Sequence, residues 1–321
     1  MKLSTTLAFS ALFLAVAGFY IYLNPSSPAP LKTSSDPASR LVLPVADKNG
    51  RVILQIQKIA SDETITLERN TEGQWVLRHP VNYPADNMMA EGLFTALRLS
   101  AKARRFVRDR GWEEYGLLKP ALKIGVEMPP QKRRYLALGD VSPTARLVYA
   151  RWEGEEEYFL VDENLKKAME RSVYSLRRKN VFTLAPAEIS RIQIRQAGKG
   201  YEFYKKEGLW VWTKPLALLG QAVPAGPFQS FEEAALGLYV KNFLDEEDPS
   251  QFDLSGGGNS IEISNEKKIE TLELGSETPE QDACYARKKN ENVLLQVARS
   301  RVQSVFAQAE ALLAAPKSKA A

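Results

Sequence analysis

The sequence has few of the residues on which catalytic and metal sites usually depend. It contains one cysteine, Cys284, and one histidine, His79, in 321 residues. A single cysteine excludes a disulfide bond within the chain. Zinc sites draw most of their ligands from Cys and His, so we expect no metal and no cofactor. Any catalytic scheme based on histidine would have to use His79.

A strong excess of charge of one sign is also missing. Lys and Arg number 43 and Asp and Glu number 39, which gives a net charge of +4. Nucleic-acid-binding proteins concentrate positive charge far more strongly, so we expect no nucleic-acid partner. Hydrophobic residues make up 44% of the chain and charged residues 26%, both near globular averages, so a packed core is expected.

The most informative feature that is present is an internal repeat. Three short motifs return in the same order with nearly constant spacing. They are Gly73–Pro80 and Gly208–Pro215, Leu138–Gly139 and Leu274–Gly275, and Tyr149–Arg151 and Tyr285–Arg287. Such matches are hard to produce by chance, so the chain is predicted to hold two tandem copies of one module. Each candidate site residue can then be compared with its partner in the other copy.

Within each copy, residues alternate between apolar and polar as half-buried strands require, and strands are predicted near Leu122–Glu127 and Leu147–Trp152 of the first copy. A helix is predicted after Asp86, with Leu93 and Leu97 on its apolar stripe. The corresponding helix of the second copy is placed near Phe231–Phe243. Strands and helices do not alternate regularly, so the predicted class is α+β. Each β-rich module has antiparallel strands and one or two helices, and the two modules follow an N-terminal transmembrane helix.

The N-terminus carries an apolar run from Leu7 to Leu23. Its length suits a membrane anchor, and its aromatic end suits a membrane interface. A secretory signal cleaved after Ala17 is the alternative. Lys2 is the only charge before the run, so the positive-inside rule places the bulk of the chain outside the cytoplasm. We therefore expect a single-pass protein of the inner membrane whose modules lie in the periplasm.

Changes in composition set the predicted domain boundaries. The anchor or signal segment covers residues 1–23, and a linker rich in Pro and Ser covers residues 24–40. Such a linker has little to bury and is predicted to be disordered. The first module is placed at residues 41–185, the second at 186–313, and a disordered tail at 314–321.

The repeat gives structural explanations for the two rarest residues. Lys214 takes the place of His79 in the second copy, which indicates a polar strand end. Val148 takes the place of Cys284 in the first copy, so the cysteine is interpreted as a small buried apolar residue. No catalytic motif is shared by both copies, and we expect that the protein is not an enzyme.

The charge pattern suggests an interaction surface. After its helix, the first copy has a basic stretch that includes Lys102, Arg104, Arg105 and Arg108. The second copy is acidic at the same place, with Asp245, Glu246 and Glu247. Opposite charges at equivalent places could dock one module on the other or form a polar binding surface. Solvated surface charge is the ordinary explanation of such runs.

Tryptophan offers another candidate for the interaction surface. Trp75 and Trp210 are equivalent and each follows a glycine turn, which indicates core packing. Trp212 has Leu77 as its partner in the first copy. If its ring is exposed, Trp212 favours a ligand-binding surface.

The order of these motifs resembles a bacterial family. The pattern is a Gly-x-Trp-Val-x-x-x-Pro strand at Gly73–Pro80, an apolar helix, Tyr115–Pro120, Leu138–Gly139 and Tyr149–Arg151, then a second Trp-Val strand. It is similar to the domain of unknown function DUF4340. The resemblance implies an N-terminal membrane segment and genes beside ABC transporters of the gliding-motility auxiliary type. It supplies no catalytic residues.

Three functions compete. The first is a non-enzymatic, membrane-tethered accessory or scaffold protein of the envelope, associated with an ABC transporter or a similar complex. The second is an extracytoplasmic binding module for a glycan, lipid or peptide in the cleft between the repeats. The third is a hydrolase with paired carboxylates, but the acidic runs at Glu155–Glu157 and Asp245–Asp248 have the pattern of solvated surface. The sequence favours the first function.

Overall fold

The computed structural model describes residues 41, 43, 50–107, 111–129, 132–143, 146–245, 247–252, 254, 258–289, 291 and 293–314. The predicted anchor and linker, and the tail beyond Ala314, lie outside these residues. None of the helices in the described part is long and apolar enough to cross a membrane. The contacts divide the described chain into two compact units. One unit holds the residues up to Thr64 with Gly92–Glu170, and the other holds Ile65–Glu91 with the residues from Arg171 onward.

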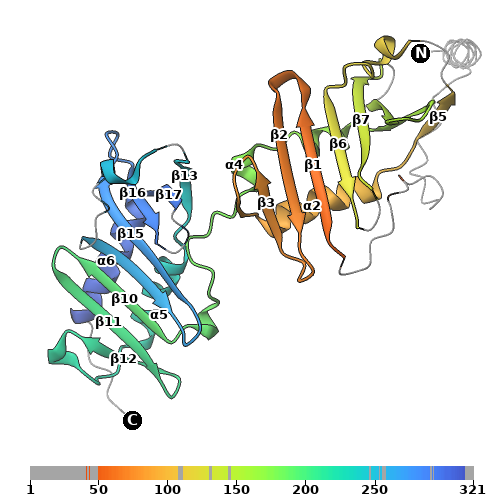
Figure 1. The fold of residues 1–321 in the computed structure, drawn as a ribbon. Helices are drawn as coiled ribbons and strands as arrows, with labels where there is room; N and C mark the ends of the chain where they lie inside the picture. The colour runs from red at the N-terminus through yellow and green to blue at the C-terminus, as the bar shows by residue number, and fades with distance from the viewer. Residues whose placement is uncertain are drawn as a thin grey trace, which may run out of the picture. The chain divides into compact units, whose positions relative to one another are not determined.

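The first sheet is antiparallel and has nine strands in the order β4-β3-β2-β1-β6-β7-β8-β9-β5 (Figure 1). Its strands are β1 (Val52–Lys58), β2 (Glu63–Arg69), β3 (Trp75–His79), β4 (Tyr83–Pro84), β5 (Arg104–Val107), β6 (Leu122–Glu127), β7 (Arg134–Val141), β8 (Leu147–Trp152) and β9 (Glu157–Asp162). Two short 3-10 helices, η2 (Ile59–Ser61) and η3 (Trp112–Tyr115), and the helices α2 (Asn87–Leu99) and α3 (Glu163–Met169) accompany these strands.

The second sheet is antiparallel and has eight strands in the order β12-β11-β10-β14-β15-β16-β17-β13. Its strands are β10 (Arg191–Gln196), β11 (Lys199–Lys206), β12 (Leu209–Lys214), β13 (Val240–Phe243), β14 (Asn259–Ser264), β15 (Ile269–Glu277), β16 (Ala283–Lys288) and β17 (Val293–Ala298). The helices are α4 (Val173–Leu176), η4 (Pro186–Glu188), η5 (Leu216–Leu218), α5 (Ala225–Leu236), η6 (Pro249–Phe252) and α6 (Arg299–Ala314).

The two sheets have the same topology. In each, the strand that is first in sequence lies inside the sheet, and the strand after the first long helix pairs at the far edge. The two-residue strand β4 corresponds to the single bridge between Val211 and Ala222 in the second copy. The peptide bonds His79–Pro80 and Lys214–Pro215 are both cis. This agreement supports the predicted duplication and the α+β class, while the predicted module boundaries stay a prediction.

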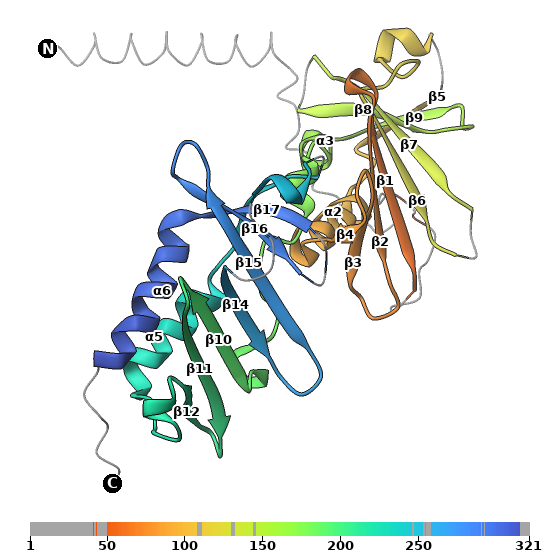
Figure 2. The same cartoon turned by 60° about the vertical axis from the view of Figure 1, so that its left-hand side comes forward.

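The core of the second unit lies between its sheet and the helices α5 and α6, which cover one face of the sheet (Figure 2). Ile192 and Ile194 of β10 and Phe203 of β11 point to this face and are buried. Alternation along each strand places polar residues such as Glu262 and Thr271 on the other face. The helices contribute Phe228 and Phe231 from α5 and, from α6, the buried residues Val302, Val305, Phe306, Ala309 and Leu312.

The helix predicted at Phe231–Phe243 has the wrong bounds. Helix α5 ends at Leu236, and Val240–Phe243 forms strand β13 instead. Gly237 is the C-cap of α5: its N–H makes a final helical hydrogen bond to the carbonyl of Glu233, and the low helix propensity of glycine favours an end there. Pro227 lies in the first turn, where a helix needs no backbone donor, so α5 begins at Ala225, ahead of the predicted bound.

Candidate functional site

The repeated motifs meet in space within the first unit. Gly139 on β7 lies against η3, so that a Cβ atom there would be 2.2 Å from the carbonyl oxygen of Tyr115. The Tyr115 ring packs on Tyr149 of β8, with 4.9 Å between the ring centroids. Arg151, two residues further along β8, holds its guanidinium 4.4 Å from the ring centre of Trp112. The Leu-Gly and Tyr-Ala-Arg motifs therefore hold η3 on the sheet.

The same arrangement occurs in the second unit. A Cβ atom on Gly275 of β15 would lie 2.1 Å from the carbonyl oxygen of Phe252 in η6. The Phe252 ring stacks on Tyr285 of β16 at 4.1 Å. Arg287 donates to the carbonyl oxygen of Leu254 at 3.2 Å. Thus the residues common to both copies are packing residues, and sequence comparison between the copies finds the fold rather than a reactive site.

The predicted basic stretch lies along an edge strand of the first sheet. Lys102 precedes β5, pairs with Glu157 at 2.8 Å and lies 4.3 Å from the ring centre of Phe159. Arg104 and Arg105 are exposed on β5 itself. Arg108 lies outside the described residues. The strand had not been predicted, because its Arg-Arg-Phe-Val sequence has no clear alternation.

The predicted acidic stretch follows strand β13. Asp245 forms an ion pair with Arg177, with 2.5 Å between the nitrogen and the oxygen. Glu247 is exposed, and Glu246 lies outside the described residues. In the described part of the chain, the acidic residue Asp245 thus pairs with Arg177, and the basic residue Lys102 pairs with Glu157. The acidic stretch meets the basic segment 177–179 in at least this one contact.

Trp212 requires a correction as a surface residue. It is 2% exposed and packs against Phe203 at 4.6 Å between ring centroids, inside the core of the second unit. Strand alternation turns Trp212 toward the helices. Trp210, two residues before it, lies on the same face and packs on Phe228 of α5 at 4.7 Å, but it is only partly buried. The exposure that would have favoured a ligand surface at Trp212 is absent, and Trp210 is the ring nearer to solvent.

The two rare residues lie where the repeat placed them. His79 is exposed at the end of β3 and Lys214 is exposed at the end of β12. Cys284 is 7% exposed in β16 and Val148 is fully buried in β8. Burial, and then the charge of Glu277, raise the pKa of the Cys284 thiol, so the reactive thiolate is disfavoured. No group of three or more metal-binding side chains occurs in the described part of the chain.

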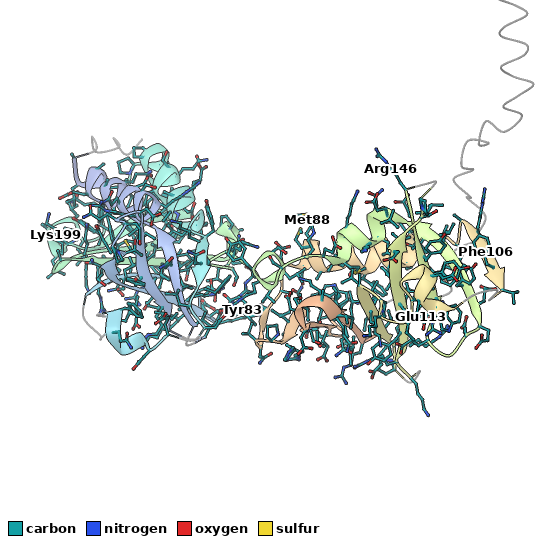
Figure 3. All side chains as sticks on the ribbon, turned by 90° about the horizontal axis from the view of Figure 1, so that it is seen from above. Tyr83, Met88, Phe106, Glu113, Arg146 and Lys199 are labelled. Carbon is teal, nitrogen blue, oxygen red and sulfur yellow. The ribbon has the colours of Figure 1, made fainter. Side chains whose placement is uncertain are left out.

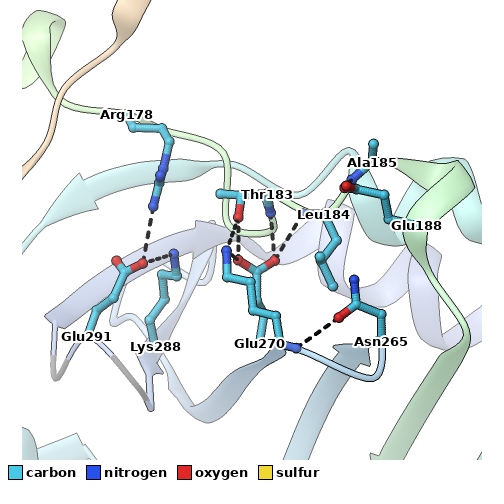
Figure 4. A network of polar contacts seen from close by, with 10 residues as sticks. Arg178, Thr183, Leu184, Ala185, Glu188, Asn265, Glu270, Lys288 and Glu291 are labelled. Carbon is cyan, nitrogen blue, oxygen red and sulfur yellow. Dashed lines mark hydrogen bonds and ion pairs between the residues drawn. The ribbon is translucent and has the colours of Figure 1, made fainter. Parts of the chain in front are cut away.

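A network of buried and partly exposed polar groups holds the chain between α4 and η4 on the second sheet (Figure 4). Glu270 of β15 is 6% exposed and accepts hydrogen bonds from the backbone N–H of Thr183 and of Leu184, and from the Thr183 hydroxyl. Lys268 forms an ion pair with the same carboxylate at 2.7 Å. Burial alone would raise the pKa of Glu270, but the bonds from Lys268 and Thr183 outweigh it and hold the pKa below its ordinary value.

A second carboxylate extends the network. Glu291 pairs with Arg178 at 3.1 Å and with Lys288 at 2.7 Å. Lys288 is 5% exposed, and this burial lowers the pKa of its ammonium group despite the favourable charge of Glu291. Burial, and then the charge of Glu291, raise the pKa of the Tyr83 hydroxyl far above its ordinary value. Tyr83 is therefore neutral at any physiological pH.

Arg177 completes the attachment. Its side chain is 3% exposed and pairs with Asp245. The guanidinium lies 3.5 Å from the ring centre of Phe243 and 4.5 Å from that of Tyr83. Such stacking uses the planar, weakly hydrated face of arginine, which lysine lacks. The segment between α4 and η4 is a second linker, distinct from residues 24–40. We call the side chains that hold it the linker clamp: Arg177, Arg178 and Thr183, with their carboxylate partners Asp245, Glu291 and Glu270.

A hollow of about 800 Å³ lies beside the linker clamp within the second unit. Trp75, Met88, Arg178, Phe182 and Leu236 are among its lining residues. A neighbouring hollow of about 450 Å³ includes Trp210, Phe228 and Glu232, and the two share Pro186 and Leu236. Both combine apolar walls with a few polar groups, as ligand sites do, and each lies beside one of the equivalent tryptophans.

Comparison with known families places this architecture. Residues 75–255 match the family described as domain of unknown function (DUF4340), which is more than half of the chain. The chain belongs to the DUF4340 family. The match begins at Trp75 in β3 and ends just after Leu254, so it covers the linker clamp from Arg177 to Asp245 but not Glu270 or Glu291. No curated protein and no solved structure matches the chain.

Proposed function

We propose that this DUF4340 protein is a non-enzymatic, membrane-tethered accessory or scaffold protein of the cell envelope. The observation that supports it best is that the repeated Leu-Gly and Tyr-Ala-Arg motifs serve packing within their own copies. Gly139 and Gly275 receive the backbone of η3 and η6, and the matching aromatic and arginine side chains hold that backbone in place. The chain thus repeats a scaffold, and the surfaces of the two copies are free to differ.

The proposed location follows from the apolar run at Leu7–Leu23 and the linker at 24–40. An anchor in the inner membrane, followed by a linker, would keep the modules in the periplasm close to membrane proteins. Tethering raises the local concentration of the modules, so weak contacts with a partner suffice. An ABC transporter or a similar envelope complex is the proposed partner.

Strand β5 is the proposed contact with that partner. Arg104 and Arg105 are exposed on it. The matching strand β13 of the second copy carries Lys241 and Asn242, and its Phe243 packs against Arg177 of the linker clamp. Edge strands that carry exposed cations are suited to acidic partner surfaces and disfavour pairing between copies. The contact surface proposed here belongs to the first copy alone.

The test is gentle crosslinking of the tagged full-length protein in its own membranes, followed by mass spectrometry of the proteins that co-purify. We expect permease and ATPase subunits of a transporter, and their loss in an Arg104→Glu, Arg105→Glu variant. Arg98→Glu, on the exposed part of α2, is the matched control and should retain them. Recovery of the tagged protein alone from the unaltered chain would contradict the proposal.

The second candidate function is a binding module for a glycan, lipid or peptide, and the hollow beside Trp75 favours it. Native mass spectrometry of protein extracted from its own membranes would show a bound molecule as added mass. Met88 lines the hollow and is 81% exposed, so Met88→Arg should remove the added mass without disturbing the fold. Leu99→Arg, at the other end of α2, should keep it. Absence of added mass from the unaltered protein counts against this function.

A further inference from the structure

The loop after β12 presents two leucines to solvent. Leu216 is 77% exposed and Leu219 is 61% exposed, while Leu218 between them packs against the core. The backbone of this loop is well bonded: the N–H of Leu219 donates to the carbonyl of Leu216 at 3.1 Å, and that of Gly220 donates to Trp212 at 2.8 Å. The leucines are therefore displayed on an ordered turn, at a cost in exposed apolar surface.

The fold of the module does not require these leucines. The equivalent connection of the first copy is shorter, because it passes from Pro80 through Asn82 directly into β4. There, Tyr83 is 2% exposed and Asn82 accepts a hydrogen bond from Arg78 at 3.0 Å. The same topology is thus built once with a polar loop and once with an apolar loop. A feature added to one copy of a duplicated fold indicates a role specific to that copy.

Lys214 directly precedes the apolar loop, and further cations lie on the neighbouring strands β10 and β11. In the register of β11 and β12, Glu202 lies opposite Lys214, so β11 extends past the end of β12 toward its own start at Lys199. Lys199 is labelled in Figure 3, and Arg195 of β10 lies opposite the next residue, Gly200. Four cations, Arg191, Arg195, Lys199 and Lys214, accompany two carboxylates here: Glu202 pairs with Lys214 and Arg191, and Glu310 pairs with Lys199, which leaves an excess of positive charge.

We propose that residues 215–220 form a membrane-contacting loop that inserts Leu216 and Leu219 into the interface of an anionic bilayer. Apolar side chains flanked by Lys and Arg are the composition of interfacial membrane binders, in which the cations attract anionic headgroups and the apolar groups enter the acyl boundary. The inference rests on the proposed membrane tether, because two leucines bind weakly by themselves and need a high local concentration of membrane. It assigns the second copy to the membrane surface.

The test uses the full-length protein in proteoliposomes. Cys284→Val removes the native thiol by introducing the residue that the first copy has, and Ala217→Cys then carries an environment-sensitive fluorophore at the loop. Lipids with a quencher in their acyl chains report contact, in phosphatidylcholine alone and in phosphatidylcholine with phosphatidylglycerol. We expect a blue shift and quenching that are stronger with the anionic lipid. A fluorophore at Glu266→Cys, in the turn at the other end of the sheet, should show neither change.

Leu216→Asp with Leu219→Asp should abolish the quenching, whereas Leu209→Asp, an equally exposed leucine at the other end of β12, should leave it intact. Unquenched fluorophore in both lipids, or equal quenching in both, overturns the membrane-contacting loop. Capture of a protein by a photocrosslinker at position 217, without lipid quenching, also overturns the proposal. It would show that the leucines bind in a groove of a partner protein. Extraction of the full-length chain by alkaline carbonate would instead show that the proposed tether has failed.

Discussion

Gly139 and Gly275 occupy the closest backbone approaches between the sheets and the short helices η3 and η6. A methyl group at either position would lie 2.2 or 2.1 Å from a carbonyl oxygen, and a backbone carbonyl moves less easily than a side chain. Gly139→Ala and Gly275→Ala are each expected to lower the free energy of unfolding by about 1–3 kcal/mol. Thermal unfolding followed by circular dichroism would measure the loss.

Gly200→Ala is the matched control for both glycine substitutions. Gly200 also lies in a strand, but no atom lies within 4 Å of its added Cβ. The free energy of unfolding of the Gly200→Ala variant should stay the same or rise by up to about 1 kcal/mol, since alanine reduces the conformational freedom of the unfolded chain. Equal losses in all three variants would show that glycine is needed for another reason than the close approach.

Cys284 is expected to resist thiol reagents in the folded protein. The side chain is 7% exposed, and its raised pKa lowers the thiolate fraction at neutral pH. Modification by a chromogenic disulfide reagent should therefore follow unfolding, with fast reaction in denaturant and slow reaction in buffer. Rapid, complete modification of the native protein at pH 7 would contradict the burial described here.

Strand β15 depends on the charged form of Glu270 at its start. Glu270→Gln keeps the shape of the side chain but weakens three hydrogen bonds and removes the ion pair with Lys268. We expect a loss of about 1.5–3 kcal/mol at neutral pH, the range for hydrogen bonds to charged groups. Glu266→Gln, on the exposed turn before β15, should change stability little.

The pH dependence of this loss has a definite sign. The folded-state pKa of Glu270 is lowered, so its contribution to stability is present above the ordinary carboxyl pKa and is lost as the pH falls through the folded value. The difference between Glu270→Gln and the unaltered protein should therefore shrink in acid. Chemical unfolding at a series of pH values tests this, and a difference that grows in acid would contradict the assignment.

Lys288 and Glu291, in the hairpin of β16 and β17, should respond unequally to substitution. Glu291→Gln leaves a lysine that is 5% exposed without its carboxylate, and breaking such a buried pair costs about 3–5 kcal/mol. Lys288→Met removes the buried charge while Glu291 keeps Arg178, so stability should be unchanged or higher. Similar losses in both variants, measured by urea unfolding, would refute this asymmetry.

The helices and strands show how much of the fold can be predicted from the sequence. Alternation predicted Leu122–Glu127 and Leu147–Trp152 with their observed bounds, because both strands bury one face. It failed for β5 and for α5, where edge position or an early proline hides the pattern. The linker clamp was beyond prediction, since Arg177 meets Asp245 only after distant segments have folded together. Runs of charged residues in the sequence show that charged side chains are present, but not which of them form ion pairs.

The duplication makes a prediction for the whole chain. Gly139 and Gly275 belong to different compact units. Substitutions at distant sites without shared partners act independently. In scanning calorimetry, the double variant Gly139→Ala, Gly275→Ala should show the two single-variant losses together, with no more than about 0.5 kcal/mol of coupling. A larger coupling would show that the two copies unfold as one cooperative body.

The position of the first strand of each copy sets the order of events during synthesis. Strand β10 lies inside its sheet, where Arg191 faces Tyr204 on one side and Ser264 on the other. Strand β13 cannot pair until β17, the last strand in the sequence, has been synthesised. A growing chain therefore exposes unpaired strand edges until almost all of a copy has been made. The proposed export would therefore be safest before the chain folds, and such a chain is a natural client for chaperones that shield strands until the closing strand has been made.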